Sequence, residues 1–566
     1  MLYLFFQFNM RPYNFKRYFE IIQVIILVFF LFIFSCSHNS EKEETRTVFR
    51  YNESHGITSL DPAYARNQVL IWPVNQLFCG LVQLGDSLSI KPCIAKSWEI
   101  LEGGKCYRFY LRNDVYFHDH KLFKDGKGRR VVASDFVYSL NRIIDPKIAS
   151  PGTWIFNNVD QARANTTNGF TAPNDTVFEI YLKQPFPAFL GILTMPYCFV
   201  VPHEVVDKYK DDFSRIPVGT GPFQFKLWKD GEKLVFVKNQ NYFEKDSSGV
   251  ALPYLDAVAI TFVNDKQSEF LEFMKGNLDF LNGVHKAYKD DLITRAGNLN
   301  PEYKDEILML KTEYLNTEYL GFLMDTAKDA SKSSPVRIKA VRQAINYGFD
   351  RAKMMKYLRN NLGTPALKGF IPKGLPSYTE SIEGYRYDQD YARELLRDAG
   401  YPNGEGLFPI ILTTTSDYLD LCEYIQHELS ILGIKIEIEV STQATYRSNL
   451  ADSRLAFFRG SWIADYPDAE NYLALFYSPN FCPAGPNYTH FKNEAYDKLY
   501  EKAMLEIDHT IRRQYYQKMN QIILDEAAVV PLFYDQVVRF THKNVEGLKS
   551  NPLNLLVLKK VHKKGN

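Results

Sequence analysis

The stretch PIILTTTSDYLDLCEYIQHELSILGIKIEIEV, residues 409–440, carries the strongest fold signal in the chain. Residues 409–413 and 434–440 are short apolar, β-branched runs typical of strands. Residues 419–432 between them have the spacing of an amphipathic helix, and a similar helix is expected at 388–399. This strand–helix–strand alternation predicts an α/β fold.

Two further helices are predicted from N-terminal signals. Ser134 is placed as the N-cap of a helix over 135–144. Ser334, followed by Pro335 at the first helical position, predicts a second helix that continues to Tyr347. Both helices are interpreted as core elements because their apolar residues recur at helical spacing.

The composition describes a large ordered protein. At 566 residues the chain is expected to contain about three to four core-sized units. Aromatic residues make up 15% of it, which provides rings for apolar clefts. A net charge of +1 provides no basic field, so nucleic acid is not expected as a partner.

The N-terminus has the features of an export signal. Arg11, Lys16 and Arg17 precede an apolar run over 21–34, which is too short to span a bilayer and leads to Ser35-Cys36. This segment resembles a bacterial lipoprotein signal over residues 1–35. The resemblance implies lipidation of Cys36, a polar tether over 36–47 and a membrane-anchored, extracytoplasmic protein. The alternative is an uncleaved signal anchor.

The cysteines show no metal-ligand or redox spacing. No C-x-x-C pair occurs, so a zinc module or thioredoxin-like site is disfavoured and no cofactor or metal is predicted. Disulfides remain open from the spacing alone. The seven cysteines are Cys36, Cys79, Cys93, Cys106, Cys198, Cys422 and Cys482.

Seven short motifs, in a fixed order, give the chain a family resemblance. They are SLDP at 59–62, IAKSWE at 94–99, VYFHD at 115–119, GTGPF at 219–223, VRQAIN at 341–346, GFIP at 369–372 and WIADYPD at 462–468. With these motifs the chain resembles the peptide-binding members of the family 5 extracellular solute-binding proteins, from about residue 49 to about residue 545.

The resemblance implies a two-lobed periplasmic-binding-protein fold of the α/β class, with hinged lobes that close on a ligand. Mapped by motif, lobe one covers 48–309 with an extra subdomain at about 76–207, lobe two covers 310–528, and 529–566 returns to lobe one. Hinge crossings are expected near Leu310 and at 529–534. The implied partners are short peptides and an ABC permease with its ATPase, and a monomer is expected.

The resemblance also implies a ligand site. Asp465 would pair with the α-ammonium group of a peptide, because a buried ammonium requires a countercharge. Arg459, Gly460, Ser461 and Trp462 match a strand that pairs with the ligand backbone, with Gly460 and Ser461 small enough to admit it.

Two departures from the family pattern affect the ligand's carboxylate. Gly56, Ile57 and Thr58 would face the ligand from lobe one, but Gly56 stands where an acidic residue is usual. The loop at 413–419 lacks the Arg or His that often fixes a peptide's C-terminus. Arg459 is therefore one candidate anchor; an anchor elsewhere, or a ligand that is not a short free peptide, is the alternative.

Catalytic interpretations find little support. The sequence HEVVD at 203–207 lacks the second histidine of a zinc protease and is interpreted as the start of a surface helix, while HDH at 118–120 is interpreted as structural. The chain is therefore not expected to be an enzyme. Alternative functions are binding of another solute (nickel chelate, haem or oligosaccharide), or a lipid-anchored hydrolase or adhesin.

Overall fold

The computed structural model describes residues 46–564, and one compact unit begins at Thr47. The predicted signal peptide at 1–35, Cys36 and nearly all of the tether lie outside the described residues. No helix in the described part combines the length and apolarity needed to cross a membrane.

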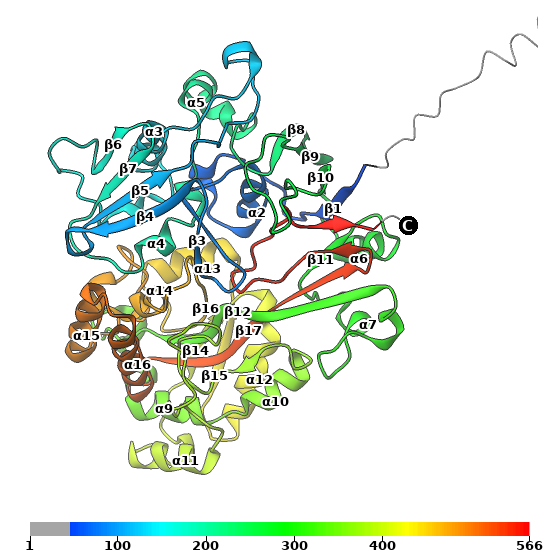
Figure 1. Cartoon of the computed structure of the whole chain (residues 1–566). Coiled ribbons are helices and arrows are strands. Elements are labelled where there is room, and N and C mark those ends of the chain that lie inside the picture. The colour runs from blue at the N-terminus through cyan, green and yellow to red at the C-terminus, as the bar shows by residue number, and fades with distance from the viewer. Residues whose placement is uncertain (1–45, 565–566) are drawn as a thin grey trace, which may run out of the picture. The chain divides into compact units, whose positions relative to one another are not determined.

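A four-stranded mixed sheet opens the unit (Figure 1). β1 (Val48–Asn52) runs parallel to β10 (Ala257–Thr261), so strands about two hundred residues apart in sequence lie side by side. β9 (Lys233–Lys238) and β8 (Phe223–Lys229) complete it as a hairpin. Gly231 occupies the turn with φ +67°, a backbone conformation that glycine adopts without strain.

A second, antiparallel four-stranded sheet lies between these strands in sequence. Its order is β4 (Ala95–Leu101), β5 (Cys106–Leu111), β7 (Val177–Tyr181) and β6 (Phe170–Asn174). α3 (Ala133–Ile144) packs against β6 and β7 and buries Phe136 and Leu140.

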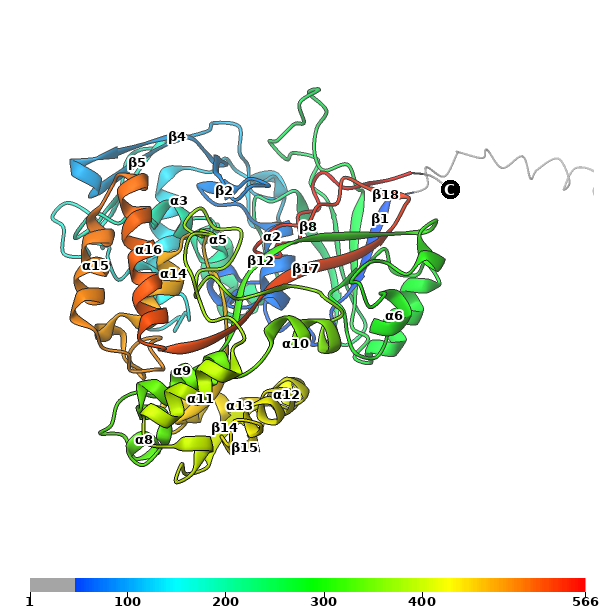
Figure 2. The same ribbon diagram turned by 90° about the horizontal axis from the view of Figure 1, so that it is seen from below.

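The largest sheet has seven strands and contains two unusually long ones. β12 (Ile307–Phe322) and β17 (Val529–His542) run antiparallel and side by side across the molecule (Figure 2). The other strands, in sheet order around this pair, are β11 (Phe280–Asn282) beside β17, then β16 (Phe457–Ile463), β14 (Ile410–Thr414) and β15 (Ile436–Val440) beyond β12, with β13 (Thr364–Pro365) also on β17.

The predicted strand–helix–strand unit is confirmed. β14 and β15 are parallel neighbours joined through α12 (Leu419–Ser430), and α11 (Gln389–Asp398) precedes them. The α/β fold class follows from this unit and from the mixed sheets around it.

One predicted helix start is wrong, and one predicted helix is interrupted after a correct start, because Ser334 holds the N-cap position with Pro335 at the first helical position. α3 is capped at Val132 rather than Ser134, because the buried Asp135 carboxylate accepts the Val132 N–H at 2.9 Å. The helix expected from Ser334 is divided into a 3-10 turn, Pro335–Arg337, and α9 (Lys339–Tyr347). The Arg342 guanidinium donates to the carbonyls of Val336 and Arg337, which a continuous helix would have used internally.

The remaining elements flank these sheets. The helices are α2 (Gln68–Leu77), α4 (Phe189–Ile192), α5 (His203–Tyr209), α6 (Lys266–Met274), α7 (Lys289–Leu292), α8 (Asp329–Lys332), α10 (Arg351–Leu358), α13 (Gln443–Ala451), α14 (Glu470–Leu473), α15 (Glu494–Leu505) and α16 (His509–Asp525). The short strands are β2 (Val82–Leu84), β3 (Ile90–Pro92), β18 (Val545–Glu546) and β19 (His562–Lys563).

Candidate ligand-binding cleft

Strand β16 carries four of the predicted site residues and leaves part of one edge unpaired by any described strand. It pairs with β12 along its whole length, from Phe457 to Ile463. On the other side β14 pairs only with Phe457 and Phe458. The backbone of 459–463 therefore has a strand partner on one side only, and such an edge can accept an extended peptide.

Asp465 follows directly after β16 and is electrostatically unusual. The residue is exposed to solvent, but the protein atoms packed around it partly desolvate the carboxyl and raise its pKa to about 6, against an opposing hydrogen bond from Asn471. No cationic side chain of the described residues contributes to that pKa. A carboxyl in this environment would be stabilised in its charged form by an incoming cation.

Asn471, from α14, joins Asp465 to Trp462. Its Oδ1 accepts the Trp462 indole N–H at 2.9 Å and the Asp465 backbone N–H at 3.2 Å. The next residue, Tyr466, is buried and its ring lies 6.4 Å from that of Trp154, in the segment that follows α3. Asp465 thus lies where β16 meets the segments around the antiparallel sheet.

Arg459 is already paired. Its guanidinium forms an ion pair with Glu318 of β12, and its Cζ lies 3.1 Å from the centre of the Tyr418 ring. The Ser461 hydroxyl donates to Glu318 at 2.9 Å. Arg459 is only 12% and Glu318 only 5% exposed, so each charge depends on the other. Nε of Arg459 is buried without a hydrogen-bond partner in the described structure.

Gly460 does not leave space for a ligand on the face of the strand where a side chain would project, so the interpretation is wrong for that face. A Cβ at Gly460 would lie 2.3 Å from the ring of Tyr319, its cross-strand neighbour. The missing side chain therefore serves packing of the Tyr319 ring inside the sheet.

A cavity of about 820 Å³ lies beside Tyr418. Residues of β12 and β17 and of the segments around β1 and β11 line it. Residues used below that line it are His55, Lys266, His285, Arg359, Tyr418 and Asp535. The Arg359 guanidinium donates to Asp535 at 2.6 Å, and its Nε is buried without a hydrogen-bond partner in the described structure.

The cavity wall includes none of the eight predicted ligand residues among those described. From the segment after β1 it takes Ser54 and His55 rather than Gly56, Ile57 and Thr58. Gly56 instead forms the turn after β1 with φ +71°, Ile57 is buried, and Thr58 is exposed.

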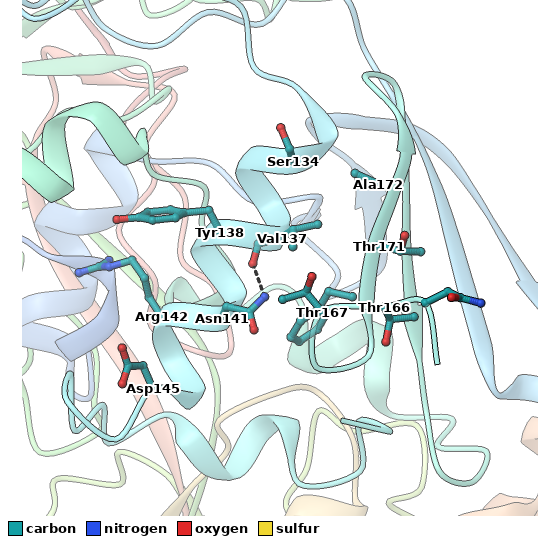
Figure 3. A pocket seen from close by; sticks show the side chains of 12 residues that line it. Ser134, Val137, Tyr138, Asn141, Arg142, Asp145, Thr166, Thr167, Thr171 and Ala172 are labelled. Carbon is teal, nitrogen blue, oxygen red and sulfur yellow. Dashed lines mark hydrogen bonds between the residues drawn. The ribbon is translucent and has the colours of Figure 1, made fainter. Parts of the chain in front are cut away.

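A separate hollow of about 660 Å³ lies between α3 and the hairpin of β6 (Figure 3). Hydroxyl and amide groups line much of it, including Thr166, Thr167 and Asn141, whose amide donates to Val137 O at 2.7 Å. Every lining residue comes from 134–172, so this hollow shares no residue with the segment from Arg459 to Asp465.

The structural interpretations of His118, in the HDH segment, and of His203, in the HEVVD segment, are confirmed. His118 is buried, and both ring nitrogens contact the backbone of the GTGPF segment: Nδ1 accepts from Gly219 N at 3.2 Å, and Nε2 lies 3.0 Å from Gly221 O. His203 is the exposed first residue of α5. In residues 46–564, no three His, Cys, Asp or Glu side chains are arranged to hold a metal ion.

The sequence interpretation missed Glu318, Asn471 and Arg359. A carboxylate within the otherwise largely buried strand β12 was a detectable signal for Glu318, because charged residues are rarely buried unless paired. Arg359 follows α10 with no spacing signal, and only the tertiary structure brings it to the cavity wall.

Comparisons with known proteins decide the family. The profile described as "Bacterial extracellular solute-binding proteins, family 5 Middle" matches residues 89–481, which is more than half of the chain. The chain belongs to this family. Family 5 proteins are the solute-binding, non-enzymatic components of ABC importers and act outside the cytoplasm.

Relatives of this family 5 protein bind several kinds of solute. The dipeptide-binding protein DppE of Bacillus subtilis is 24% identical over 92% of this chain and 93% of the relative. Heme-binding protein A of Haemophilus influenzae is 27% identical over 82% and 83%.

Among solved structures, the periplasmic binding protein DppA from Helicobacter pylori, in complex with the peptide STSA, has a TM-score of 0.73 and 26% identity. It covers 93% of this chain and 100% of its own. The two-lobed α/β fold of periplasmic binding proteins is therefore the fold of this chain.

Proposed function

We propose that this family 5 protein is a lipid-anchored receptor that captures short peptides between its lobes and delivers them to an ABC permease and its ATPase. The observation that carries the proposal is Asp465, a solvent-accessible carboxyl whose pKa is raised by desolvation and which has no cationic partner among the described residues. A peptide's α-ammonium group supplies the missing charge. A dipeptide-binding relative and a peptide-bound structural neighbour support the same ligand class.

The ligand backbone would lie along the edge of 459–463. Main-chain pairing there is independent of the peptide's side chains, so many sequences are accepted. Ser461 and Trp462 would border the ligand from β16, next to Asp465. The segment 56–58 would approach it from lobe one when the lobes close.

Two arginines are candidates for the peptide's carboxylate. To bind the peptide's carboxylate, Arg459 must either release Glu318 or bind Glu318 and the ligand at the same time. Arg359 lines the cavity and donates to Asp535 through Nη2. Its other guanidinium nitrogens could bind the peptide's carboxylate without displacing Asp535. A short peptide held at Asp465 would reach one of the two, and its length would select which.

For the lobes, we propose 48–309 with an extra subdomain at about 76–207, 310–528, and a return at 529–566. The hinge would lie on β12 and β17. Their register shifts between Glu313 and Thr317, and a pairing irregularity lets a long strand pair bend.

For the N-terminus, we propose cleavage after residue 35, lipidation of Cys36 and a tether to residue 47. One chain contains both walls of the cleft, so a monomer suffices for capture.

The test is thermal unfolding of the chain from Ser37 onward, after any co-purified ligand is removed by unfolding and refolding. A pool of di- to pentapeptides is added to the wild type and to Asp465→Ala, and the same pool with acetylated N-termini is the matched control. Binding to the folded state alone stabilises it by about 2.7 kcal/mol at roughly one hundred times Kd.

The expected result is a rise in Tm with free peptides only, lost in Asp465→Ala. An equal rise with acetylated peptides would remove Asp465 as an amine anchor. No rise with either pool would exclude the peptide receptor.

A second candidate ligand is haem. One relative is a heme-binding protein, and two imidazoles, His55 and His285, line the cavity, where they could serve as iron ligands. A shifted haem absorbance band on addition to the protein, lost in His285→Ala or His55→Ala, would support it over peptides.

A further inference from the structure

Four polar side chains meet on the outer part of lobe two, in an arrangement that peptide capture does not use. Asp325 follows β12, Ser453 follows α13, and Cys482 and His490 come from the loop after α14. His490 Nδ1 lies 3.0 Å from the Asp325 carboxylate. His490 Nε2 lies 3.0 Å from the Ser453 hydroxyl and 3.4 Å from the Cys482 sulfur.

These contacts define the proton positions. Nδ1 faces a carboxylate, which only accepts, so Nδ1 carries the ring proton of the neutral imidazole and Nε2 is the acceptor. Hydrogen bonds from Ala327 N and His490 outweigh the effect of burial and hold the pKa of Asp325 below its usual value. Asp325 therefore stays charged and keeps Nε2 available to the thiol and the hydroxyl.

The backbone holds this cluster in an unusual conformation. Ser453 has φ +58° and His490 has φ +49°, in the left-handed region that non-glycine residues rarely adopt. Strained residues that contact each other through functional groups are more common at sites with a chemical role than in simple cores. The His490 ring is also stacked on Phe481, with centroids 4.4 Å apart, so its orientation is restrained.

Cys482 differs from the other described cysteines in its environment. Burial raises the pKa of the Cys422 thiol to about 11 and that of Cys198 well above the usual range. Among the described cysteines only Cys482 contacts an imidazole. The sulfur also lies 3.2 Å from the Ser453 hydroxyl and 3.7 Å from Leu450 O. The thiol is buried, but Pro483 and Ala484 next to it are exposed, so a small displacement of this loop admits a small reagent.

We propose that Cys482 is an activated thiol and a site of reversible covalent modification by low-molecular-weight disulfides, with His490 as its proton acceptor and Asp325 as the residue that positions His490. The arrangement is the one that nucleophilic cysteines require: a base in hydrogen-bond reach and a third group that orients the base.

The modification is a thiol–disulfide exchange. The Cys482 S–H proton passes to His490 Nε2, and the thiolate attacks one sulfur of the disulfide. The S–S bond of the reagent breaks, a new bond forms between Cys482 Sγ and that sulfur, and the leaving thiolate takes the proton from His490. One equivalent of small thiol is released, and excess small thiol reverses the reaction.

The experiment measures the modification rate of individual cysteines in the full chain. The probe is 2-hydroxyethyl disulfide at about neutral pH, and peptide mass spectrometry separates the cysteines. The variants are His490→Gln, Asp325→Asn and the conservative Asp325→Glu, with Cys482→Ala as a blank. Cys422 in each protein reports general unfolding, because it is equally buried but lacks a base.

In the wild type, Cys482 is expected to react at least about ten-fold faster than Cys422. His490→Gln and Asp325→Asn should slow Cys482 about ten-fold and move its rate profile to higher pH, while Asp325→Glu restores much of the rate. A Cys482 rate no greater than that of Cys422 in the wild type would overturn the proposal, even if every variant failed to fold. So would a Cys482 rate unchanged by His490→Gln.

Discussion

At Asp465, the burial that raises the pKa of the carboxyl also favours the binding of a cation. The charged form has lost part of its hydration and has no cationic side chain to replace it among the described residues. Arg459 and Glu318 show the opposite solution, because these two buried charges neutralise each other. The candidate site thus contains one ion pair, Arg459 with Glu318, and one carboxylate, Asp465, whose charge a cationic ligand group can neutralise.

The first prediction concerns pH. Peptide affinity should fall as the pH drops below about 6, because protonation of Asp465 removes the charge that pairs with the ligand's ammonium group. Isothermal titration calorimetry across this range is the measurement. In Asp465→Asn the affinity should be low and nearly independent of pH. Wild-type affinity that stays constant through this range would contradict the role of Asp465.

The same pKa shift predicts a cost in stability without ligand. A carboxyl whose pKa is raised by folding destabilises the folded protein as the pH rises from the usual value toward about 6 and above. Asp465→Asn should therefore raise the Tm of the ligand-free protein at neutral pH while abolishing the peptide-induced rise. A lower Tm for this variant would show that the charged carboxylate is stabilised by the protein itself.

Glu318→Gln should leave Arg459 buried without its countercharge. Breaking one partner of a buried pair costs about 3 kcal/mol, so the midpoint of urea unfolding should fall clearly. Glu494→Gln is the control, since its pair with Lys498 at 2.6 Å is exposed, and exposed ion pairs add little to stability. Equal midpoints for the two variants would mean that the Arg459 pair adds little to stability.

At the scale of elements, His118 connects two segments far apart in sequence. Its ring lies between the strand-like residues 115–118 and the GTGPF segment that begins β8. Burial lowers its pKa to about 4, against a raising contribution from the hydrogen bond to Gly221 O. Gly219 and Gly221 are required here because a Cβ at either would overlap the backbone at Leu77.

We expect this connection to make the protein acid-sensitive. The unfolded chain takes up a proton at His118 below about pH 6.5, but the folded one does so only near pH 4. Stability should therefore be full above the unfolded pKa and should be lost as the pH falls between these values, by up to about 3 kcal/mol. Urea unfolding of the wild type and of His118→Gln, measured at several pH values, isolates the effect. An equal loss in both proteins would assign it to other groups.

At the scale of the whole molecule, the long strands β12 and β17 connect the segments whose residues line the cavity. The two strands run side by side. Where their pairing register shifts, the strand pair can bend with the loss of few hydrogen bonds. Closure on a ligand would bring both walls of the cavity into contact with it.

A binding peptide should therefore decrease the radius of gyration measured by small-angle X-ray scattering. Asp465→Ala with the same peptide is the control and should keep the ligand-free value. Identical scattering with and without peptide, at concentrations that calorimetry shows to be saturating, would contradict hinge closure.

The sequence by itself determined the fold class and the family. The alternation of strands and helix over 409–440 follows from local hydrophobic periodicity, and the ordered motifs from 59 to 468 identify the family without coordinates. Two local predictions failed because nearby side chains bond the backbone there: the Asp135 carboxylate accepts the Val132 N–H at the start of α3, and Arg342 donates to the carbonyls of Val336 and Arg337, where the helix predicted after Ser334 is interrupted.

Only the tertiary structure decided the electrostatics of the cleft and the cluster around Cys482. Glu318 and Arg459 are 141 residues apart, and Asp325 and His490 are 165 apart. Sequence spacing contains no information on such pairs, because sheet pairing and loop closure bring them together. Desolvation is also a property of the assembled molecule, and it is desolvation that raises the pKa of Asp465.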